Sequence, residues 1–437
     1  MYWAISISIL LNVFFNSNLK KKFGGYRFLE IGFHLNFFLS LYIIIPTVVF
    51  ITSSFTVGDP ISYVFNGFAF SNESLFIKHI IKMLVFQLVF IVAYLKTRNN
   101  KIIKYETTDF KFKKTFIIVL SLILAICYIL LIGLSSDFDG YIESYQRYDH
   151  LNRPLRLFVS FIVRFKFAFI VLFLIHFFIY YKGKKIILII GFLCLMIVEA
   201  YYSSGARISI LFLLFQGFGL YVIVNGLPKI KNILIGSLIC LVLFTVIEKS
   251  RIDSEDDVTN ELAGLLPGEF GSVFFTSYHL YQKRDDNQLP NKSYKMLFFD
   301  FISPLIPNAD LDEIDPIFWY QKNYFPSSEV PPFTLGPIAN TAIWEGEIGL
   351  VLRAWLCALL FGEFSNYITR RKIIPFYLFI YLSVFSTTVM VMKYSIFYHF
   401  TPFIKNLIFP FILFLILRYI FTIYSKNTLA KPDEISR

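Results

Sequence analysis

Two arginines beside long apolar segments have the chemistry to hold a phosphate group. Arg207 follows the small residues 203–206 (Ser-Ser-Gly-Ala), and Arg251 lies just past the end of another apolar segment. A guanidinium grips phosphate oxygens with two parallel hydrogen bonds, and the free amides at a helix start add positive charge. We therefore expect Arg207 and Arg251 to clamp one diphosphate. The alternative for Arg207 is an interfacial arginine that reaches lipid phosphate.

Two further cations, Arg164 and Lys166, fall inside the apolar segment 157–180. They lie roughly 12 to 15 Å below its outer end, at 1.5 Å per helical residue. Charge at that depth is costly unless it lines a hydrated cavity or finds a partner. Arg164 and Lys166 are therefore expected either to reach the diphosphate from below or to pair with buried acids or carbonyls.

Three residues are candidates for a general base. His279 is the only histidine of the polar segment 249–335, and a lone histidine is often structural. Glu345 and Glu347 follow directly after that segment, where carboxylates near a membrane helix suggest function. An ion pair with Arg353, two turns further on, is the alternative for these carboxylates. His279 and Glu345 are the first candidates and Glu347 the third.

The sequence predicts neither a metal site nor a cofactor. Four carboxylates lie close together at Asp310, Asp312, Glu313 and Asp315. They lack the spacing, the central glycine and the distal glutamate of a calcium-binding loop, so a solvated acidic loop is expected. The cysteines all fall inside apolar runs, at Cys127, Cys194, Cys240 and Cys357. Their spacing predicts neither a disulfide nor a zinc site.

The elements that must position these residues are membrane helices. Hydrophobic residues make up 56% and charged residues 16% of the 437, and the mean hydropathy is +0.63. Apolar runs occur at about 2–16, 28–54, 75–95, 115–134, 157–180, 186–202, 208–226, 233–248, 336–362, 375–395 and 403–424. Runs of about 20 apolar residues span a bilayer. We predict an all-α polytopic membrane protein of about eleven helices, in a single integral membrane domain over 1–437.

The loops alternate in charge along the chain. Lys and Arg gather at 20–27, 96–114, 182–185, 229–231, 370–372 and in the C-terminal tail. The loop 55–73 has neither residue, and the segment 249–335 carries seven basic against fourteen acidic residues. Because basic loops stay in the cytoplasm, the N-terminus is predicted outside and the C-terminus inside. The same rule explains the net charge of +11 without a nucleic-acid partner.

The longest polar segment runs from about Lys249 to Leu335 and is predicted to face away from the cytoplasm. Arg251 begins it and Glu345 lies just past its end, so it is expected to act as a lid over a basic membrane cavity. Its aromatic residues could stack on sugars or anchor the segment at the membrane interface. They are Tyr278, Tyr281, Trp319, Tyr320 and Tyr324.

Three stretches resemble the O-antigen polymerase family, often called Wzy. The first is the turn 203–207 followed by a returning apolar helix, and the second is a large late outer loop with a proline-rich close at 301–307. The third is 333–340 leading to Gly346 and Gly349, two glycines three apart. Asn340 stands where many members have a glutamate, so the choice of base stays open.

The resemblance implies a GT-C-like fold with one large periplasmic loop between helices eight and nine, in the bacterial inner membrane. It implies a metal-independent glycosyltransferase that polymerises undecaprenyl-diphosphate-linked oligosaccharide repeat units into O-antigen or a related surface polysaccharide. Arg207 and Arg251 would bind the diphosphate, with Arg164 and Lys166 deeper, and His279 or Glu345 would take the proton. Membrane lipids and a chain-length regulator protein are the partners implied.

Other classes of membrane protein remain as alternatives. O-antigen ligases share the outer arginines and a long loop. A flippase or transporter of lipid-linked oligosaccharide could use Arg164 and Lys166 as a path for an anionic lipid, although internal repeats are not seen. Metal-dependent glycosyltransferases with many spans would be expected to carry an acidic pair in the first outer loop, where Asp59 and Glu73 lie far apart.

Overall fold

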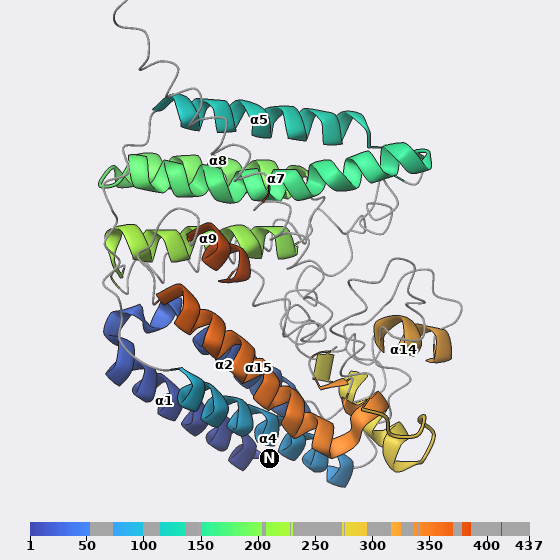
Figure 1. The fold of residues 1–437 in the computed structure, drawn as a ribbon. Coiled ribbons are helices and arrows are strands. Elements are labelled where there is room, and N and C mark those ends of the chain that lie inside the picture. Colours follow the sequence, from blue (N-terminus) through green and yellow to red (C-terminus); the bar gives the residue numbers. More distant parts are fainter. Residues whose placement is uncertain are drawn as a thin grey trace, which may run out of the picture. The chain divides into compact units, whose positions relative to one another are not determined.

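All regular secondary structure in the part of the chain that the structure describes is helical (Figure 1). This computed structural model describes residues 1–52, 73–98, 114–135, 148, 150–202, 207–227, 229, 273–274, 276–294, 316–324, 336, 338–339, 341–369, 378–385 and 412. The predicted helix at 233–248, Arg251, Asn340 and the acidic run 310–315 lie outside these residues. The chain divides into two compact units, 1–106 with 221–372 and 385–401, and 107–220 with 373–384 and 402–437.

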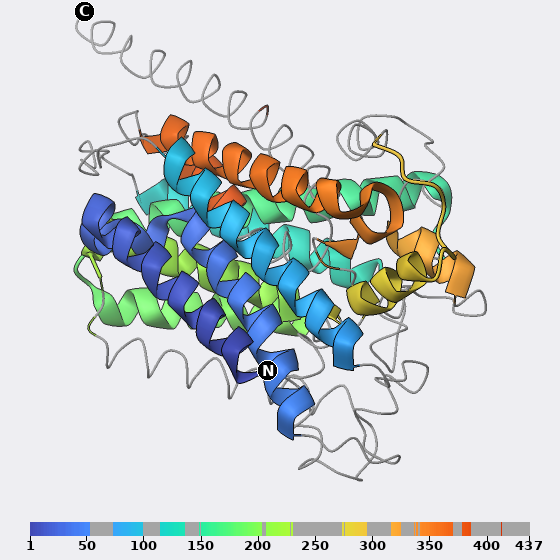
Figure 2. The same ribbon diagram turned by 90° about the horizontal axis from the view of Figure 1, so that it is seen from below.

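The first unit is built on four long helices. They are α1 (Tyr2–Phe23), α2 (Ile31–Thr52), α4 (Glu73–Thr97) and α15 (Gly346–Thr369), and the short helix η1 (Gly24–Leu29) joins α1 to α2. Figure 2 shows the four lying side by side, in blue and orange. Large apolar side chains on their outer faces are exposed, among them Leu10, Leu88 and Ile348. Apolar outer faces suit helices that meet lipid.

Close approach of helices in this unit depends on small residues. A Cβ placed on Gly32 of α2 would lie 2.5 Å from the ring of Tyr94 on α4. On α15, a Cβ at Gly362 would lie 2.9 Å from the Cγ2 atom of Thr97. Small residues that let backbones approach are the usual contact of membrane helices, because lipid gives no hydrophobic drive for helix association.

A layer of polar side chains lies inside the bundle of α1, α2 and α4. The amide of Gln87 donates to Asn36 at 3.1 Å and to Ser40 at 2.8 Å, and Ser8 donates to the carbonyl oxygen of Gln87 at 3.2 Å. Asn12 donates to Ser40 at 2.7 Å. Since each polar group inside a membrane bundle must find its partner within the protein, this layer fixes the register of the three helices.

The second unit contains α5 (Lys114–Gly133), α7 (Arg153–Tyr180), α8 (Lys185–Tyr202) and most of α9 (Arg207–Asn225). The side chain of Asn152 accepts a hydrogen bond from the amide of Leu155 and caps α7. Pro154 lies in the first turn of α7, where a backbone N–H would have no partner within the helix, so the missing N–H of proline costs nothing. A Cβ at Gly191 of α8 would lie 2.3 Å from the ring of Phe177, so α7 and α8 pack at close range.

Several of these helices can cross a membrane. Among the described residues, four are long and apolar enough: Ile31–Val48, Ser74–Thr97, Arg153–Tyr180 and Thr341–Tyr367. Three shorter apolar helices are Ile117–Gly133, Ile186–Glu199 and Ile210–Asn225. The chain is therefore a multi-pass helical membrane protein in character. The count of eleven spans, the single domain and the orientation of the termini stay predictions.

Relative helix directions agree with the predicted alternation of the loops. α4 and α15 run in the same direction, since Lys82 meets Glu347 at one end and Arg98 meets Asn366 at the other. α2 runs opposite to α4, because Glu30 at its start contacts Arg98 at the end of α4. The charge pattern predicts the same directions: α4 and α15 inward from the outer face, and α2 outward.

Candidate functional site

A break in the helix before α15 is the local feature that builds the site. Residues Thr341–Glu345 form a π-helical turn, η3, and Gly346 then adopts φ +72° before α15 begins. A residue with a side chain rarely takes this left-handed conformation, which explains a glycine here. Such π turns interrupt the regular ladder of hydrogen bonds and are frequent at functional sites. The turn leaves carbonyl groups that need other donors.

Arg284 supplies most of those donors. Its Nε donates to the carbonyl oxygen of Ala342 at 2.9 Å, its Nη2 donates to that of Ile343, and its Nη1 donates to that of Pro290 at 2.6 Å. The amide of Ser293 donates to the carbonyl oxygen of Trp344 at 2.7 Å. These bonds fasten segment 284–293 of the polar excursion to the start of α15.

The helix over residues 276–285, yellow in Figure 1, lies beside the start of α15 and also contacts α4. His79 of α4 shares a 3.0 Å hydrogen bond with the hydroxyl of Ser277. The ring of Phe274, just before this helix, packs edge-on against His79 with ring centroids 4.6 Å apart. Part of the excursion is thus fixed to the ends of two membrane helices, and its role as a lid stays a prediction.

A cavity of about 440 Å³ opens where α4, α15 and this segment meet. Its walls carry three cations and two carboxylates, together with asparagine amides and the backbone of Gly346. The lining residues are Lys82, Tyr281, Arg284, Asp285, Asn287, Leu289, Asn291, Lys292, Gly346 and Glu347. A concave site with convergent polar groups is where a ligand is best held.

Lys82 reaches the cavity from inside an apolar helix. Its Nζ lies 3.9 Å from the ring centroid of Tyr281, a cation–π contact. The same Nζ lies 3.6 Å from Oε1 of Glu347, whose side chain is 72% exposed while that of Lys82 is 15% exposed. An ion pair with so exposed a partner is weak. The ammonium of Lys82 is therefore held in place by the ring and remains open to a stronger anion.

Gly346 brings Lys292 against the backbone of the break. A Cβ at Gly346 would lie 2.9 Å from Cε and 3.1 Å from Nζ of Lys292. The lysine side chain thus occupies the space that any larger residue would take. Gly346 is required twice here, for its positive φ and for the close approach of Lys292.

Tyr281 forms the floor beside Lys82. Its hydroxyl bonds to Oγ1 of Thr341, and Thr341 donates its own proton to the carbonyl oxygen of Ile338 at 2.5 Å. Tyr281 must therefore be the donor to Thr341. Burial raises the pKa of the Tyr281 phenol above its usual range, so it stays protonated at every physiological pH. It is a fixed ring and donor rather than a proton carrier.

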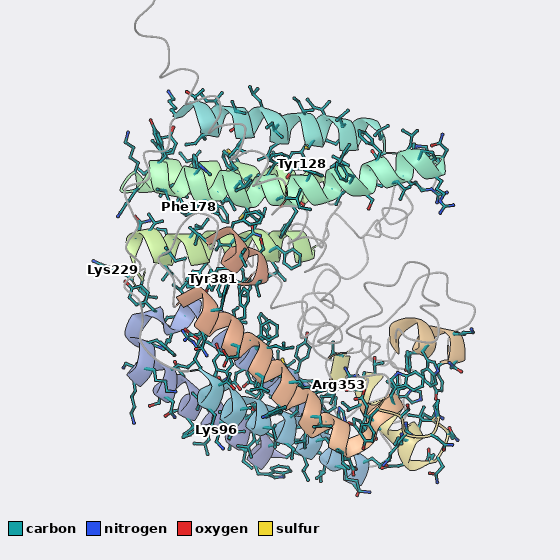
Figure 3. All side chains as sticks on the ribbon, viewed as in Figure 1. Lys96, Tyr128, Phe178, Lys229, Arg353 and Tyr381 are labelled. Atoms are coloured by element: carbon teal, nitrogen blue, oxygen red, sulfur yellow. The ribbon has the colours of Figure 1, made fainter. Side chains whose placement is uncertain are left out.

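Glu345 forms a buried ion pair with Arg353 (Figure 3). Nε of Arg353 donates to Oε2 at 2.6 Å, Nη2 donates to Oε1, and both side chains are fully buried. This is the pairing that the sequence left open as the alternative to a general base. A Cβ at Gly349 would lie 2.1 Å from Cβ of Glu345, so the second glycine of the 346–349 pair makes room for this carboxylate.

His279 faces away from α4 towards an aromatic cluster. Its Nδ1 shares a 3.0 Å hydrogen bond with the hydroxyl of Tyr320 on α14 (Pro316–Tyr324), and its ring contacts Tyr324 edge-on at 5.1 Å. Burial, followed by the charge of Lys283, lowers the pKa of His279 to about 4. The imidazole is therefore neutral at pH 7.

The same cluster reaches the helix break. Trp319 of α14 packs edge-on against Trp344 with ring centroids 5.6 Å apart, and Trp344 directly precedes Glu345. The indole N–H of Trp344 is buried, with no hydrogen-bond partner among the residues that the structure describes. His279 and Glu345 thus belong to one local assembly, joined through α14. Tyr278, another of the predicted stacking residues, instead packs near Phe76 and His79 of α4.

Lys166 lies in the second unit and is paired there. Its Nζ donates to both carboxylate oxygens of Glu199, at 2.9 and 2.8 Å, and lies 4.9 Å from the ring centroid of Tyr128 (Figure 3). Tyr128 donates to Oε2 of Glu199 at 2.5 Å. Lys166 and Glu199 are 4% and 5% exposed. Pairing with a buried acid is the second of the two expectations stated for Lys166.

The predicted clamp is only partly described. Arg207 is the first residue of α9, as the sequence predicts for a helix that starts there, but its side chain lies outside the described residues, as does that of Arg164. All of Arg251 lies outside them. The roles of Arg207, Arg251 and Arg164 stay predictions. Within the described ranges, no group of three or more His, Cys, Asp or Glu side chains could hold a metal ion.

Sequence reasoning did not find Lys82, Arg284 and Lys292. The signal for Lys82 was present, because it lies seven residues into the apolar run 75–95, the same anomaly that marks Lys166. Arg284 and Lys292 look like ordinary solvated charges of a polar segment. Their role depends on contacts with residues about 55 to 60 positions later, as the Arg284 to Ala342 bond illustrates.

Comparison with known proteins gives no relative. No protein-family model, curated protein or solved structure matches this chain.

Proposed function

We propose that this chain is a membrane glycosyltransferase that polymerises undecaprenyl-diphosphate-linked oligosaccharide repeat units into O-antigen or a related surface polysaccharide. The proposal includes a place in the bacterial inner membrane, with the N-terminus and the excursion 249–335 on the periplasmic side and the C-terminus in the cytoplasm. The donor is a lipid-diphosphate sugar chain, and the acceptor is a lipid-linked repeat unit.

One observation carries the proposal. A cavity lined by Lys82, Arg284 and Lys292 lies where two parallel membrane helices end beneath a polar segment. The loop charges put this end of α4 and α15 at the outer face. A substrate with a lipid tail, a diphosphate and a sugar needs membrane, cationic and aromatic surfaces in that order. The bundle, the cavity and the cluster of Trp319, Tyr324 and His279 offer the three side by side.

The chemistry required is modest, because the diphosphate is already a good leaving group. The acceptor hydroxyl oxygen attacks the anomeric carbon of the donor, the bond from that carbon to the diphosphate oxygen breaks, and the electron pair leaves with the lipid diphosphate. Fixed cations stabilise the developing charge, and a base removes the hydroxyl proton. In the proposal, Arg207 and Arg251 clamp the diphosphate and Arg164 lies deeper, while Lys166 stays paired with Glu199.

Of the two first candidates for the base, His279 has the better arrangement. Both oxygens of Glu345 accept from Arg353, so protonating Glu345 would cost the buried pair. His279 is neutral at pH 7 and half-buried beside Tyr320. Its lowered pKa makes it a weak base alone, and a nearby diphosphate would raise that pKa towards the usual 6.5.

Reconstitution of the full chain tests the proposal against its alternatives. Proteoliposomes receive lipid-linked repeat units on one side only, and both product length and lipid side are measured. Chain extension without translocation supports the polymerase. Translocation without extension would instead identify a flippase, and transfer only to a lipid A-type acceptor would identify an O-antigen ligase. Either result overturns the proposal.

The variant Arg207→Ala tests the clamp within the same assay. Long products should be abolished while the protein remains folded in the membrane, because the developing charge on the diphosphate loses its strongest ligand. Near-normal chain length would remove Arg207 from the mechanism.

A further inference from the structure

Three cations converge on the cavity from three different segments. Lys82 comes from α4, Arg284 from the helix 276–285, and Lys292 from the turn after it. Like charges gathered in one partly buried site repel each other, and here Asp285 and Glu347 offset only two of the three. Lys292 and Asp285 are exposed, so water screens much of this repulsion, and the net positive charge that remains at the cavity attracts an anion.

The donors that face the cavity are incompletely used. Three of the five N–H groups of Arg284 bond to described carbonyl oxygens, which leaves two. Lys292 shows no hydrogen bond or ion pair to any residue that the structure describes. The side-chain amides of Asn287 and Asn291 line the same wall. Each of these groups suits a phosphate oxygen, and phosphate forms the stronger, charge-assisted hydrogen bonds.

Glu347 already behaves as an internal anion at this site. Its carboxylate lies 3.6 Å from Lys82, beyond good hydrogen-bond length, and is 72% exposed. A more highly charged anion can displace it because little free energy holds the pair together. Once displaced, the carboxylate swings into solvent without leaving a buried charge behind.

We propose that this cavity binds a phosphate or diphosphate group through Lys82 and Lys292, with the two remaining N–H groups of Arg284 as a third contact. Glu347 occupies Lys82 until the phosphate arrives. A volume of about 440 Å³ leaves room for a diphosphate and the first atoms attached to it. The described residues that line the cavity belong to the first unit, and none of them is one of the predicted clamp residues Arg207, Arg251, Arg164 and Lys166. Identification of the ligand as a lipid diphosphate rests on the proposed function.

Isothermal titration of the full-length protein with sodium diphosphate tests the site. The protein is held in phosphatidylcholine nanodiscs, which add no anionic lipid. Lys82→Met should weaken binding at least about tenfold, the loss of one charge-assisted contact. Glu347→Gln should strengthen it about two- to fivefold, because the competing carboxylate is gone. Lys96→Met, at an exposed position at the far end of the same helix, is the matched control and should change nothing.

The opposite signs of the two variants separate binding from a structural role. A merely structural Lys82–Glu347 pair would weaken binding in both variants, and that result overturns the proposal, as does unchanged affinity in Lys82→Met. If Lys82→Met does not fold, Lys292→Met provides the same test from another segment, with the same expected loss.

Competition identifies the source of the phosphate. Undecaprenyl diphosphate and phosphatidylglycerol are added to the nanodiscs in separate titrations. Displacement of diphosphate by the undecaprenyl lipid alone assigns a lipid-diphosphate site, and equal displacement by phosphatidylglycerol assigns a general headgroup site. Displacement by neither assigns a site for soluble phosphate. Diphosphate binding without chain extension would support the proposed site and contradict the proposed polymerase function. Chain extension together with unchanged binding in Lys82→Met would support the polymerase function and contradict the proposed site.

Discussion

The two ends of the α4–α15 pair use charge in opposite ways. At one end, Arg98 is fully buried, and its Nε and Nη2 each donate to a carboxylate oxygen of Glu30 at 2.9 Å while its Nη1 donates to Asn366 at 2.8 Å. At the other end, Lys82 faces a cavity whose two carboxylates, Asp285 and Glu347, are both exposed. The comparison teaches that α4 carries two kinds of charge. Arg98 holds the helices of the bundle together, whereas Lys82 remains available to bind an anion.

Further contacts complete the locked end. Tyr94 donates to Oε2 of Glu30 at 2.9 Å, and Lys22 at the end of α1 donates to the carbonyl oxygens of Leu95 and Arg98 at 3.0 and 3.2 Å. The ion pair thus joins the ends of α2, α4 and α15, and Lys22 adds the end of α1 through backbone carbonyl oxygens. The Lys82 end instead opens into a cavity whose walls come from three segments.

The largest expected effect is from breaking the locked end. Arg98→Met should destabilise the protein by about 3 to 5 kcal/mol, because it leaves the carboxylate of Glu30 buried without its charge partner. Thermal unfolding of the purified protein in detergent measures this. The double variant Glu30→Leu with Arg98→Met removes both charges and should recover part of the loss. Equal instability of the single and double variants would contradict an ion-pair origin.

The Glu345–Arg353 pair at the other end is expected to be similarly sensitive, at about 3 kcal/mol for Arg353→Leu. This variant also tests the site, since the pair sits directly behind the helix break. Diphosphate titration of whatever folded protein remains should show weakened binding, because Gly346 and Glu347 follow Glu345 in the chain. Unchanged stability would mean that the pair is not buried in the membrane-embedded protein.

The next effect is a pH dependence at the aromatic cluster. The pKa of His279 is about 4 in the folded protein and about 6.5 in the unfolded chain. Between pH 6.5 and pH 4, His279 binds a proton in the unfolded chain but not in the folded protein. The free energy of unfolding therefore falls as the pH drops from 6.5 to 4 and becomes constant below pH 4. The loss attributable to His279 should be about 1 to 2 kcal/mol, reduced by its partial exposure.

Thermal unfolding of the wild type and of His279→Gln across this pH range isolates that contribution. Other groups titrate in both proteins, so only the difference between the two curves is assigned to His279. The difference should shrink steadily as pH falls from 6.5. A constant difference would show that the imidazole titrates normally and is accessible to water.

A smaller effect is expected at the glycine of the break. Gly346→Ala should cost about 1 to 2 kcal/mol, because alanine is strained at φ +72° and its Cβ would displace Lys292. Because Lys292 is displaced, the affinity for diphosphate should fall as well. That loss of affinity would not be expected if the substitution caused backbone strain alone. Gly183→Ala, at φ +86° with open space around it, is the matched control: it carries the strain without the binding loss.

The sequence predicted well those helices that the structure describes, and it predicted the site only in part. The run 115–134 became α5 (Lys114–Gly133), because a continuous apolar stretch is a direct signal of a membrane helix. The run 2–16 was too short, since α1 continues through Lys20–Lys22 to Phe23. Lysine is a good helix former and suits the negative end of the helix dipole, so the helix outlasts its apolar composition.

Arg98 shows why counting charges along the sequence cannot distinguish a solvated loop residue from a residue of a buried ion pair. It was one of the seven basic residues assigned to the loop 96–114, yet it is buried against Glu30, 68 residues earlier. The cavity is hidden for the same reason. Lys82 meets Tyr281 across about 200 residues, and a single sequence holds no periodicity that pairs them. The pairing of Glu345 with Arg353 could be predicted because the two residues are only eight positions apart, about two helical turns.

The smallest expected effect on stability makes the comparison of the two ends sharpest. Lys82→Met is the counterpart of Arg98→Met on the same helix, and should cost less than about 1 kcal/mol, because an exposed ion pair and one cation–π contact are all that is lost. Methionine keeps an unbranched apolar stem against Tyr281, so packing changes little. Thermal unfolding of both variants in the same detergent gives the ratio directly. If Lys82→Met lowered the free energy of unfolding as much as Arg98→Met does, Lys82 would have a structural role like that of Arg98. That result would contradict the proposal that the cavity binds a ligand.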